Sequence, residues 1–180
     1  MLEEIDLEEY EKEGAINKNF DSTDEDELES YDLVNEKNND LKTHEKIKIN
    51  LCGNIIELDS GYSKTTLQTT QDMVLDDLGL IHSGFIFGAA DYAAAIAVNE
   101  ANFIVIDSRS QFLAPAKLND LIEFEATAKF ENSRKREIKV IANINEIKIF
   151  EGIFHAVILE EHILKRKAKE PPKPPKLPKQ

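Results

Sequence analysis

Cysteine is almost absent from this chain, in which Cys52 is the single thiol. One cysteine cannot form an intrachain disulfide, so the sequence predicts a protein of a reducing compartment, and we expect a cytoplasmic location. The first residues are acidic and lack the basic-then-apolar order of a secretion signal. Long apolar runs are also missing. The longest, residues 81–98, is interrupted by His82, Ser83 and Asp91, and it falls short of the roughly 20 apolar residues that cross a bilayer.

Basic charge is scarce except at the C-terminal end. Residues 1–46 hold 17 acids and 5 bases, residues 47–162 hold 17 acids and 10 bases, and residues 163–180 hold 7 bases and 1 acid. Nucleic-acid binding draws most of its affinity from basic groups that neutralise phosphates. The middle of the chain has no such excess, so we expect no nucleic-acid partner.

Three regions follow from the composition. Residues 1–46 are an acidic arm whose sparse apolar residues predict disorder. Residues 163–180 hold five of the six prolines and predict an extended, Lys-rich, disordered tail. Either flank could be a solvated end or a docking segment for a protein partner. Residues 47–162 remain as the folded domain.

The domain has the pattern of many strands and one helix. Residues 84–98 are rich in Ala and apolar on every face, which predicts a buried helix. Alternating apolar residues, with Gly152 as a candidate bulge, predict strands at residues 47–58, 62–70, 103–106, 110–114, 121–130, 138–144 and 147–159. The compact solution is an α+β fold in which an antiparallel sheet wraps one central helix. Free sheet edges then favour pairing with a second copy.

The most unusual residue in the helix is Asp91, since a carboxylate among apolar neighbours is costly unless it is paired, hydrated or facing a cavity. Gly84, Gly88 and Asp91 fall on one helical face, with His82 just before the helix. The N–H groups at such a helix start could stabilise an oxyanion. Alternatively, Ser83 only caps the helix, Asp91 points to solvent or to a strand hydroxyl, and His82 is a loop residue. Histidines at metal-ligand spacing are lacking, so no metal site is expected.

The helix region resembles a known family. The segments GLIHSG at residues 79–84 and ADYA at residues 90–93 resemble the G-x-x-H-G-G-x(6)-D-x-A signature of hotdog acyl-CoA thioesterases of the phenylacetic-acid-degradation type. Residues 53–63, 111–116 and 150–152 are similar to the effector domain of the malonyl-CoA-responsive repressor of fatty-acid synthesis, which is also a hotdog. Small hotdog proteins of Campylobacter and its relatives are similar as well.

The resemblance implies a homodimer or a dimer of dimers, an acyl-CoA substrate or ligand, and no further cofactor. It implies that Asp91 is the general base or nucleophile and that the Gly84 N–H holds the oxyanion, with His82 beside the thioester. The neighbouring positions Ser83, Phe85, Gly88 and Phe112 would contact the substrate. Arg109 would contact a CoA phosphate, or it is only a surface charge.

Three positions at which this sequence differs from one of the two families bear on the choice between possible functions. Ser83 replaces the first glycine of the thioesterase pair, and His82 replaces the repressor arginine that grips malonate, so malonyl specificity does not carry over. Asp91 stands where the repressor has Asn, which favours hydrolysis of an acyl-CoA to acid and CoA. The charged flanks instead favour a non-catalytic acyl-CoA sensor that signals to a protein partner. A related dehydratase or scaffold role is the third alternative.

Overall fold

The computed structural model describes residues 41–130 and 134–165, so most of the predicted arm and almost all of the predicted tail lie outside the described residues. Six strands form one antiparallel sheet in the order β1-β2-β4-β5-β6-β3. Their bounds are β1 Asn54–Asp59, β2 Tyr62–Gln68, β3 Phe103–Phe112, β4 Leu121–Phe130, β5 Lys135–Ile144 and β6 Ile147–Ile158.

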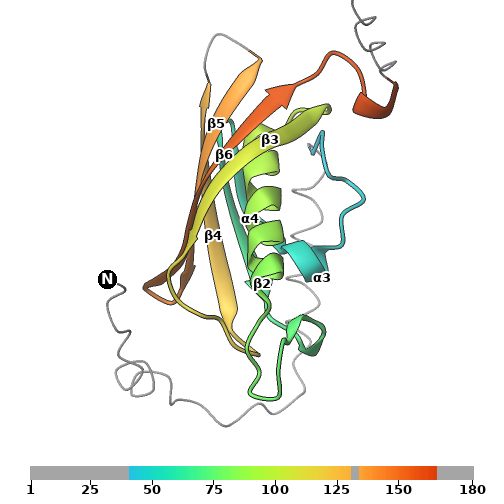
Figure 1. Ribbon diagram of the computed structural model, residues 1–180. Helices are drawn as coiled ribbons and strands as arrows, with labels where there is room; N and C mark the ends of the chain where they lie inside the picture. Colours follow the sequence, from blue (N-terminus) through green and yellow to red (C-terminus); the bar gives the residue numbers. More distant parts are fainter. Residues whose placement is uncertain (1–40, 131–133, 166–180) are drawn as a thin grey trace, which may run out of the picture. The chain divides into compact units, whose positions relative to one another are not determined.

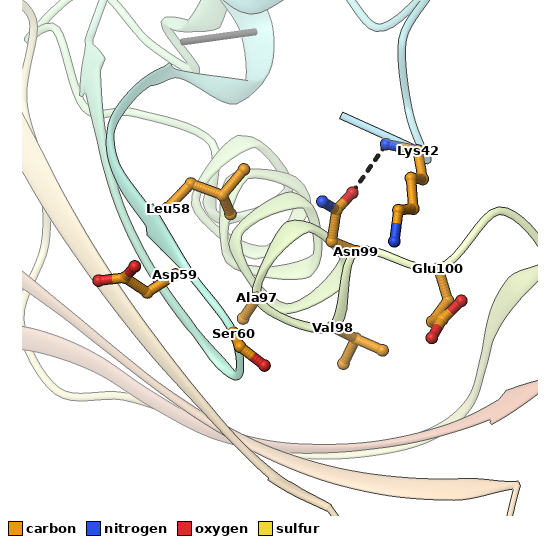
Figure 2. A pocket seen from close by; sticks show the side chains of 8 residues that line it. All are labelled: Lys42, Leu58, Asp59, Ser60, Ala97, Val98, Asn99 and Glu100. Atoms are coloured by element: carbon orange, nitrogen blue, oxygen red, sulfur yellow. Dashed lines mark hydrogen bonds between the residues drawn. The ribbon is translucent and has the colours of Figure 1, made fainter. Parts of the chain in front are cut away.

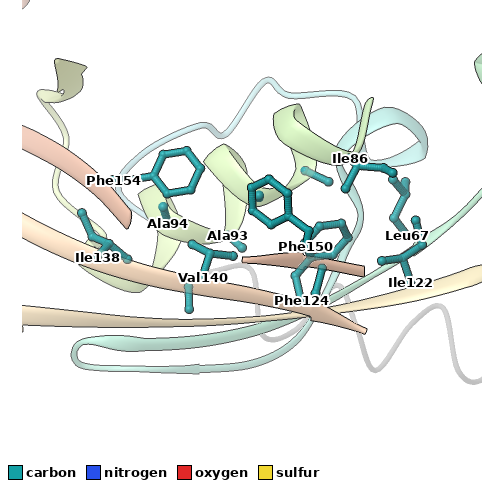
Figure 3. Close-up of a cluster of buried hydrophobic side chains, with 14 of the residues drawn as sticks. Leu67, Ile86, Ala93, Ala94, Ile122, Phe124, Ile138, Val140, Phe150 and Phe154 are labelled. Carbon is teal, nitrogen blue, oxygen red and sulfur yellow. The ribbon is translucent and has the colours of Figure 1, made fainter. Parts of the chain in front are cut away.

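The helix α4, Ser83–Val98, runs along one face of this sheet (Figure 1). Every second residue of β4 from Ile122 to Ala128 is buried and faces the helix, as the strand period of two requires. Small residues on the helix, such as Ala93 and Ala94, let the strands approach closely, and the aromatic and branched side chains of the sheet fill the space between (Figure 3). The predicted α+β arrangement of one buried helix on an antiparallel sheet is confirmed.

The structure corrects the prediction of one strand over residues 47–58. Residues Ile49–Cys52 form a single helical turn, α3, and β1 begins only at Asn54. Gly53 separates the two with a φ of 103°, and a Cβ there would lie 2.7 Å from the Thr66 carbonyl oxygen. Ile49 and Leu51, which the alternation assigned to the strand, therefore belong to a helical turn that contacts α4 and β2 (Figure 1).

Two further differences concern β3 and β6. The predicted short strands at 103–106 and 110–114 are one strand, since β6 pairs with the polar residues between them. The bulge of β6 falls at Ile149, where the register with β5 shifts, and Gly152 is paired regularly. A Cβ on Gly152 would lie 2.9 Å from the Phe154 ring and 3.1 Å from the Phe150 ring, so this glycine makes room for two buried aromatic side chains.

Residues 41–48 continue from α3 over the side of α4 that the sheet leaves uncovered. Leu41, Ile47 and Cys52 pack against a small buried cluster of Ile55, Tyr92 and Ile96. Residues 41–46, assigned above to the acidic arm, thus pack on the domain. Two short 3-10 helices, η2 Gln71–Met73 and η3 Ile163–Lys165, complete the described elements. Of the helices in the described part, none has the length and apolar character to cross a bilayer.

Candidate active site

The start of α4 is capped by a histidine. The imidazole Nδ1 of His82 accepts a hydrogen bond of 2.9 Å from the Gly84 N–H, and His82 is the N-cap residue. The alternative that Ser83 caps the helix is therefore wrong. A ring nitrogen that accepts carries no proton, so the cap requires a neutral imidazole protonated on Nε2. The N–H at Gly84, the candidate oxyanion donor, is consequently already bonded within the chain.

Beyond the cap, α4 presents an open face that is formed by glycine. Gly84 is exposed, and a Cβ placed on Gly88 would meet no atom within 4 Å. Asp91 follows one turn after Gly88 and is half-buried, whereas most of the rest of the helix is buried in the core. We call Gly84, Gly88 and Asp91 the glycine face. It brings a helix start with exposed backbone and a carboxylate onto one side of the same helix.

The carboxyl group of Asp91 is not in bulk water. Burial raises its pKa above the usual 3.8, and nearby His44 opposes that shift. A carboxylate whose pKa moves toward the working pH is a stronger base while it is still ionised, which is the property of a general base. As predicted, Asp91 lies on a protected face of α4. The catalytic role of its carboxylate is a proposal.

The sequence analysis did not select two titratable side chains that interact with Asp91, those of His44 and Cys52, nor Tyr92, which interacts with Cys52. Burial lowers the pKa of His44 below 6.5, and the charge of Asp91 acts in the opposite direction. The pKa of the Cys52 thiol is raised by burial and then by Asp91, so the thiol stays protonated at neutral pH. Burial, followed by Cys52, raises the pKa of Tyr92 to about 12. His44 lay in a segment assigned to the disordered arm, and no periodic pattern in the sequence marks it.

The other residues predicted to contact the substrate do not all lie on the same side of the sheet as α4. The ring of Phe85 lies edge-on to that of His82, with centroids 6.2 Å apart. Phe112 is 49% exposed and packs edge-on against Phe150, on the same side of the sheet as α4. Arg109 is opposite Ile153 in the register of β3 and β6, and it therefore points to the face away from α4. Within one chain, the structure does not bring Arg109 together with Asp91.

Two cavities lie away from the glycine face. One of about 350 Å³ is at the C-terminal end of α4, where the Lys42 N–H donates to the Asn99 side-chain oxygen (Figure 2). The other, of about 250 Å³, is lined by Arg109 and its neighbours on β3 and β6. In the described residues, no group of three or more His, Cys, Asp or Glu side chains is arranged to hold a metal ion.

The fold and this helix are those of a known class of protein. The family model of the thioesterase superfamily matches residues 78–139, which include the whole of α4. A sigma28-regulated virulence protein from Campylobacter jejuni is 46% identical with a TM-score of 0.67, and the match covers 69% of this chain and 96% of that one. The chain belongs to the thioesterase superfamily, and its fold is the hotdog. The predicted resemblance to small Campylobacter hotdog proteins is confirmed.

Two other proteins are similar to this chain in sequence. An uncharacterised protein from Pyrococcus horikoshii is 34% identical with a TM-score of 0.67, over 68% of this chain and 95% of that one. A methylthioribose-1-phosphate isomerase from Aquifex aeolicus is 38% identical over 120 residues, which are 67% of this chain. Those residues span only 26% of the isomerase, about a quarter of its length.

Two solved structures share the fold at lower identity. A hypothetical thioesterase with coenzyme A from Streptococcus pneumoniae is 16% identical with a TM-score of 0.54, over 60% of this chain and 86% of that one. A Streptococcus mutans protein bound to acetyl CoA is 15% identical with a TM-score of 0.58, over 66% and 97%. At this identity the likeness concerns the fold alone.

Proposed function

We propose that this protein binds an acyl-CoA on the glycine face and hydrolyses its thioester to the free acid and CoA. The observation that carries the proposal is the placement of Asp91. Its half-buried carboxyl group lies one turn beyond an open glycine, on the helix whose first residues, Ser83 and Gly84, are exposed. The superfamily and the CoA-bound proteins of the same fold support an acyl-CoA as the ligand.

The chemistry assigned to Asp91 is general base catalysis. The ionised carboxylate takes a proton from water as the water oxygen attacks the thioester carbonyl carbon. The Gly84 N–H, once the His82 ring has turned away, donates to the developing oxyanion. The C–S bond then breaks, the electron pair leaves with sulfur, and the proton held by Asp91 passes to the CoA thiolate. The products are the carboxylic acid and CoA.

We further propose that two copies pair through β3. This strand lies at one edge of the sheet and is 10 residues long, so its outer edge has backbone groups without a partner strand in the described chain. Ile106 and Phe112 on the strand, and Leu113 just after it, are 56%, 49% and 44% exposed. A second copy at this edge would cover these apolar side chains.

Sedimentation of the wild type and of Ile106→Lys would test the dimer, which the charged variant should weaken.

One observation favours a second candidate function, in which the protein binds acyl-CoA without turnover. The N–H that would hold the oxyanion already donates to His82 Nδ1 at 2.9 Å. A site whose oxyanion donor stays occupied could retain a thioester intact. Such a binding module would report acyl-CoA to a partner protein, and the charged segments 1–46 and 163–180 are the candidates for that contact.

Release of free thiol from a panel of acyl-CoAs distinguishes the two functions. Hydrolysis predicts turnover by the wild type and a loss of about 100-fold or more in Asp91→Asn. Asp107→Asn is the matched control, since this carboxylate is exposed and lies on the opposite face of the sheet, 3.3 Å from His155 Nδ1. Tight binding of acyl-CoA by both the wild type and Asp91→Asn, with no thiol released, would support the sensor and refute hydrolysis.

A further inference from the structure

The cavity around Arg109 lies on the face of the sheet that points away from α4. It has a volume of about 250 Å³, and it is lined by Arg109, Gln111, Glu151, Gly152 and Ile153. We call this cavity the outer hollow. In the register of β3 and β6, Arg109 is opposite Ile153 and Gln111 is opposite Glu151, so these four side chains share the outer face. The outer hollow is therefore built on the edge strand β3 and its neighbour β6.

The guanidinium group of Arg109 has no partner in the described part of the chain. It makes no hydrogen bond and no ion pair with residues 41–130 or 134–165. The carboxylate of Asp107 is two residues earlier on the same face of β3, but its Oδ2 lies 3.3 Å from His155 Nδ1. An arginine whose N–H fork meets no carboxylate is able to bind an anion from solution.

The acid in the lining, Glu151, is already paired with two lysines. Its Oε1 lies 2.7 Å from Lys139 Nζ, and its Oε2 lies 3.0 Å from Lys148 Nζ. Hydrogen bonds from Lys139 and then from Lys148 lower the pKa of Glu151, so this carboxyl group stays ionised and held by the lysines. Together with Arg109, three bases are thus grouped with one acid at the outer hollow, in a chain whose net charge is -13. The local excess of positive charge is opposite in sign to that of the whole chain.

We propose that the outer hollow binds a phosphate group, with Arg109 as the residue that holds it. The guanidinium presents its N–H groups as a planar fork that matches two phosphate oxygens, and the Gln111 amide is a donor for a third. Lys139, opposite Ile153 in the register of β5 and β6, adds positive charge from the next strand. The outer hollow lies on the other face of the sheet from Asp91, so the proposal does not depend on hydrolysis at that carboxylate.

The size and charge of the outer hollow favour a phosphate group. Its volume of about 250 Å³ is below the roughly 300–1,000 Å³ of sites that enclose a whole small molecule, so it suits a single charged group. A phosphate monoester carries roughly 1.5 to 2 negative charges and three acceptor oxygens, which match the excess of bases and the donors on two sides. The group has two possible sources. It is the 3′-phosphate of CoA, whose nucleotide end would pass round the edge strand β3, or it is free phosphate.

Calorimetric titration of the full chain with potassium phosphate, against potassium chloride at equal ionic strength, tests the site. We expect Arg109→Gln to weaken phosphate binding about tenfold or more, and Arg109→Lys to weaken it less, because Lys keeps the charge without the fork. Arg134→Gln is the matched control, since Arg134 is exposed and already paired with Glu160. Phosphate should also shift the NMR amide signals of residues 109–111 and 151–153 in the wild type. Equal phosphate affinity in the wild type and Arg109→Gln, or no binding beyond that of chloride, would overturn the proposal.

Binding of CoA and of dephospho-CoA, which lacks the 3′-phosphate, identifies the source of the group. If CoA supplies it, the wild type should bind CoA about tenfold more tightly than dephospho-CoA, and Arg109→Gln should remove that difference. If the source is free phosphate, the wild type should bind both equally well, while Arg109→Gln still loses affinity for inorganic phosphate. Phosphate binding that depends on Arg109, in a protein that releases no thiol from acyl-CoA, would refute hydrolysis and support this site.

Discussion

His82 holds the backbone group on which the proposed chemistry depends, so its replacement gives a sharp prediction. The imidazole Nδ1 accepts from the Gly84 N–H at 2.9 Å, and both residues are exposed. His82→Ala removes that acceptor and leaves the N–H free for a thioester oxygen. We expect the variant to be less stable and at the same time a faster catalyst at low substrate concentration.

The sizes of both effects follow from one hydrogen bond. Loss of a side-chain cap to Ala costs about 0.5–2 kcal/mol, which for a domain of this size lowers Tm by a few degrees. An exposed hydrogen bond that must break before the oxyanion can form contributes about 0.5–1.5 kcal/mol to the barrier. Its removal should therefore raise kcat/KM by about two- to tenfold.

The chain supplies a matched control for this experiment. His162 makes the same local contact, with its Nδ1 accepting from the Leu164 N–H at 3.2 Å at the start of η3. His162→Ala removes an equivalent bond outside the glycine face, so kcat/KM should stay at the wild-type value. Thermal unfolding and thiol release are measured on both variants.

A fall in kcat/KM in His82→Ala, with stability unchanged, would refute this reasoning. That result would mean that the imidazole contacts the thioester itself, and that another N–H group holds the oxyanion.

Three further predictions concern single residues. Burial raises the pKa of Asp91, so the ionised carboxylate lowers the free energy of unfolding. Asp91→Asn should therefore be more stable than the wild type at pH 7. Denaturant midpoints should show that this difference in stability disappears as the pH falls toward 3.8. Gly88→Ala adds a methyl group in open space on the glycine face, so it should raise Tm through about 1 kcal/mol of helix propensity while raising KM for acyl-CoA. Gly152→Ala forces a Cβ to within 2.9 Å of the Phe154 ring and should cost about 1–3 kcal/mol in urea unfolding; a near-neutral result would show that the two rings move apart freely.

The elements with a strong periodic pattern were predictable from the sequence. The apolar, Ala-rich run predicted α4 to within one residue, and the alternation from Leu121 predicted the bounds of β4. In both cases the local pattern and the tertiary environment agree, because each residue faces the side that its polarity favours. Asp91 was also recognisable, since a carboxylate in an apolar helix conflicts with burial wherever the helix packs.

The sequence failed where the partner of a residue is distant in the chain. The polar residues of β3 read as a break between two short strands, yet β6 pairs with all of them. For Arg109 the sequence left a CoA phosphate contact and a surface charge open, and only the register opposite Ile153 shows that the side chain is on the face of the sheet away from α4. A shift of one residue in the pairing of two strands moves every side chain of a strand to the opposite face of the sheet. The face on which each β3 side chain lies therefore depends on the pairing with β6, which is distant in the chain.

The sequence alone determined the fold class, the central helix and the carboxylate in it, because these depend on local periodicity and on the cost of burying a charge. The tertiary structure decided what surrounds that carboxylate. His44 and Cys52 precede Asp91 by 47 and 39 positions in the sequence, and only the packing of residues 41–53 on α4 brings them to it. Whether the N–H at the start of α4 is free or bonded was also decided by the tertiary structure, because it depends on the orientation of the His82 ring toward the Gly84 N–H.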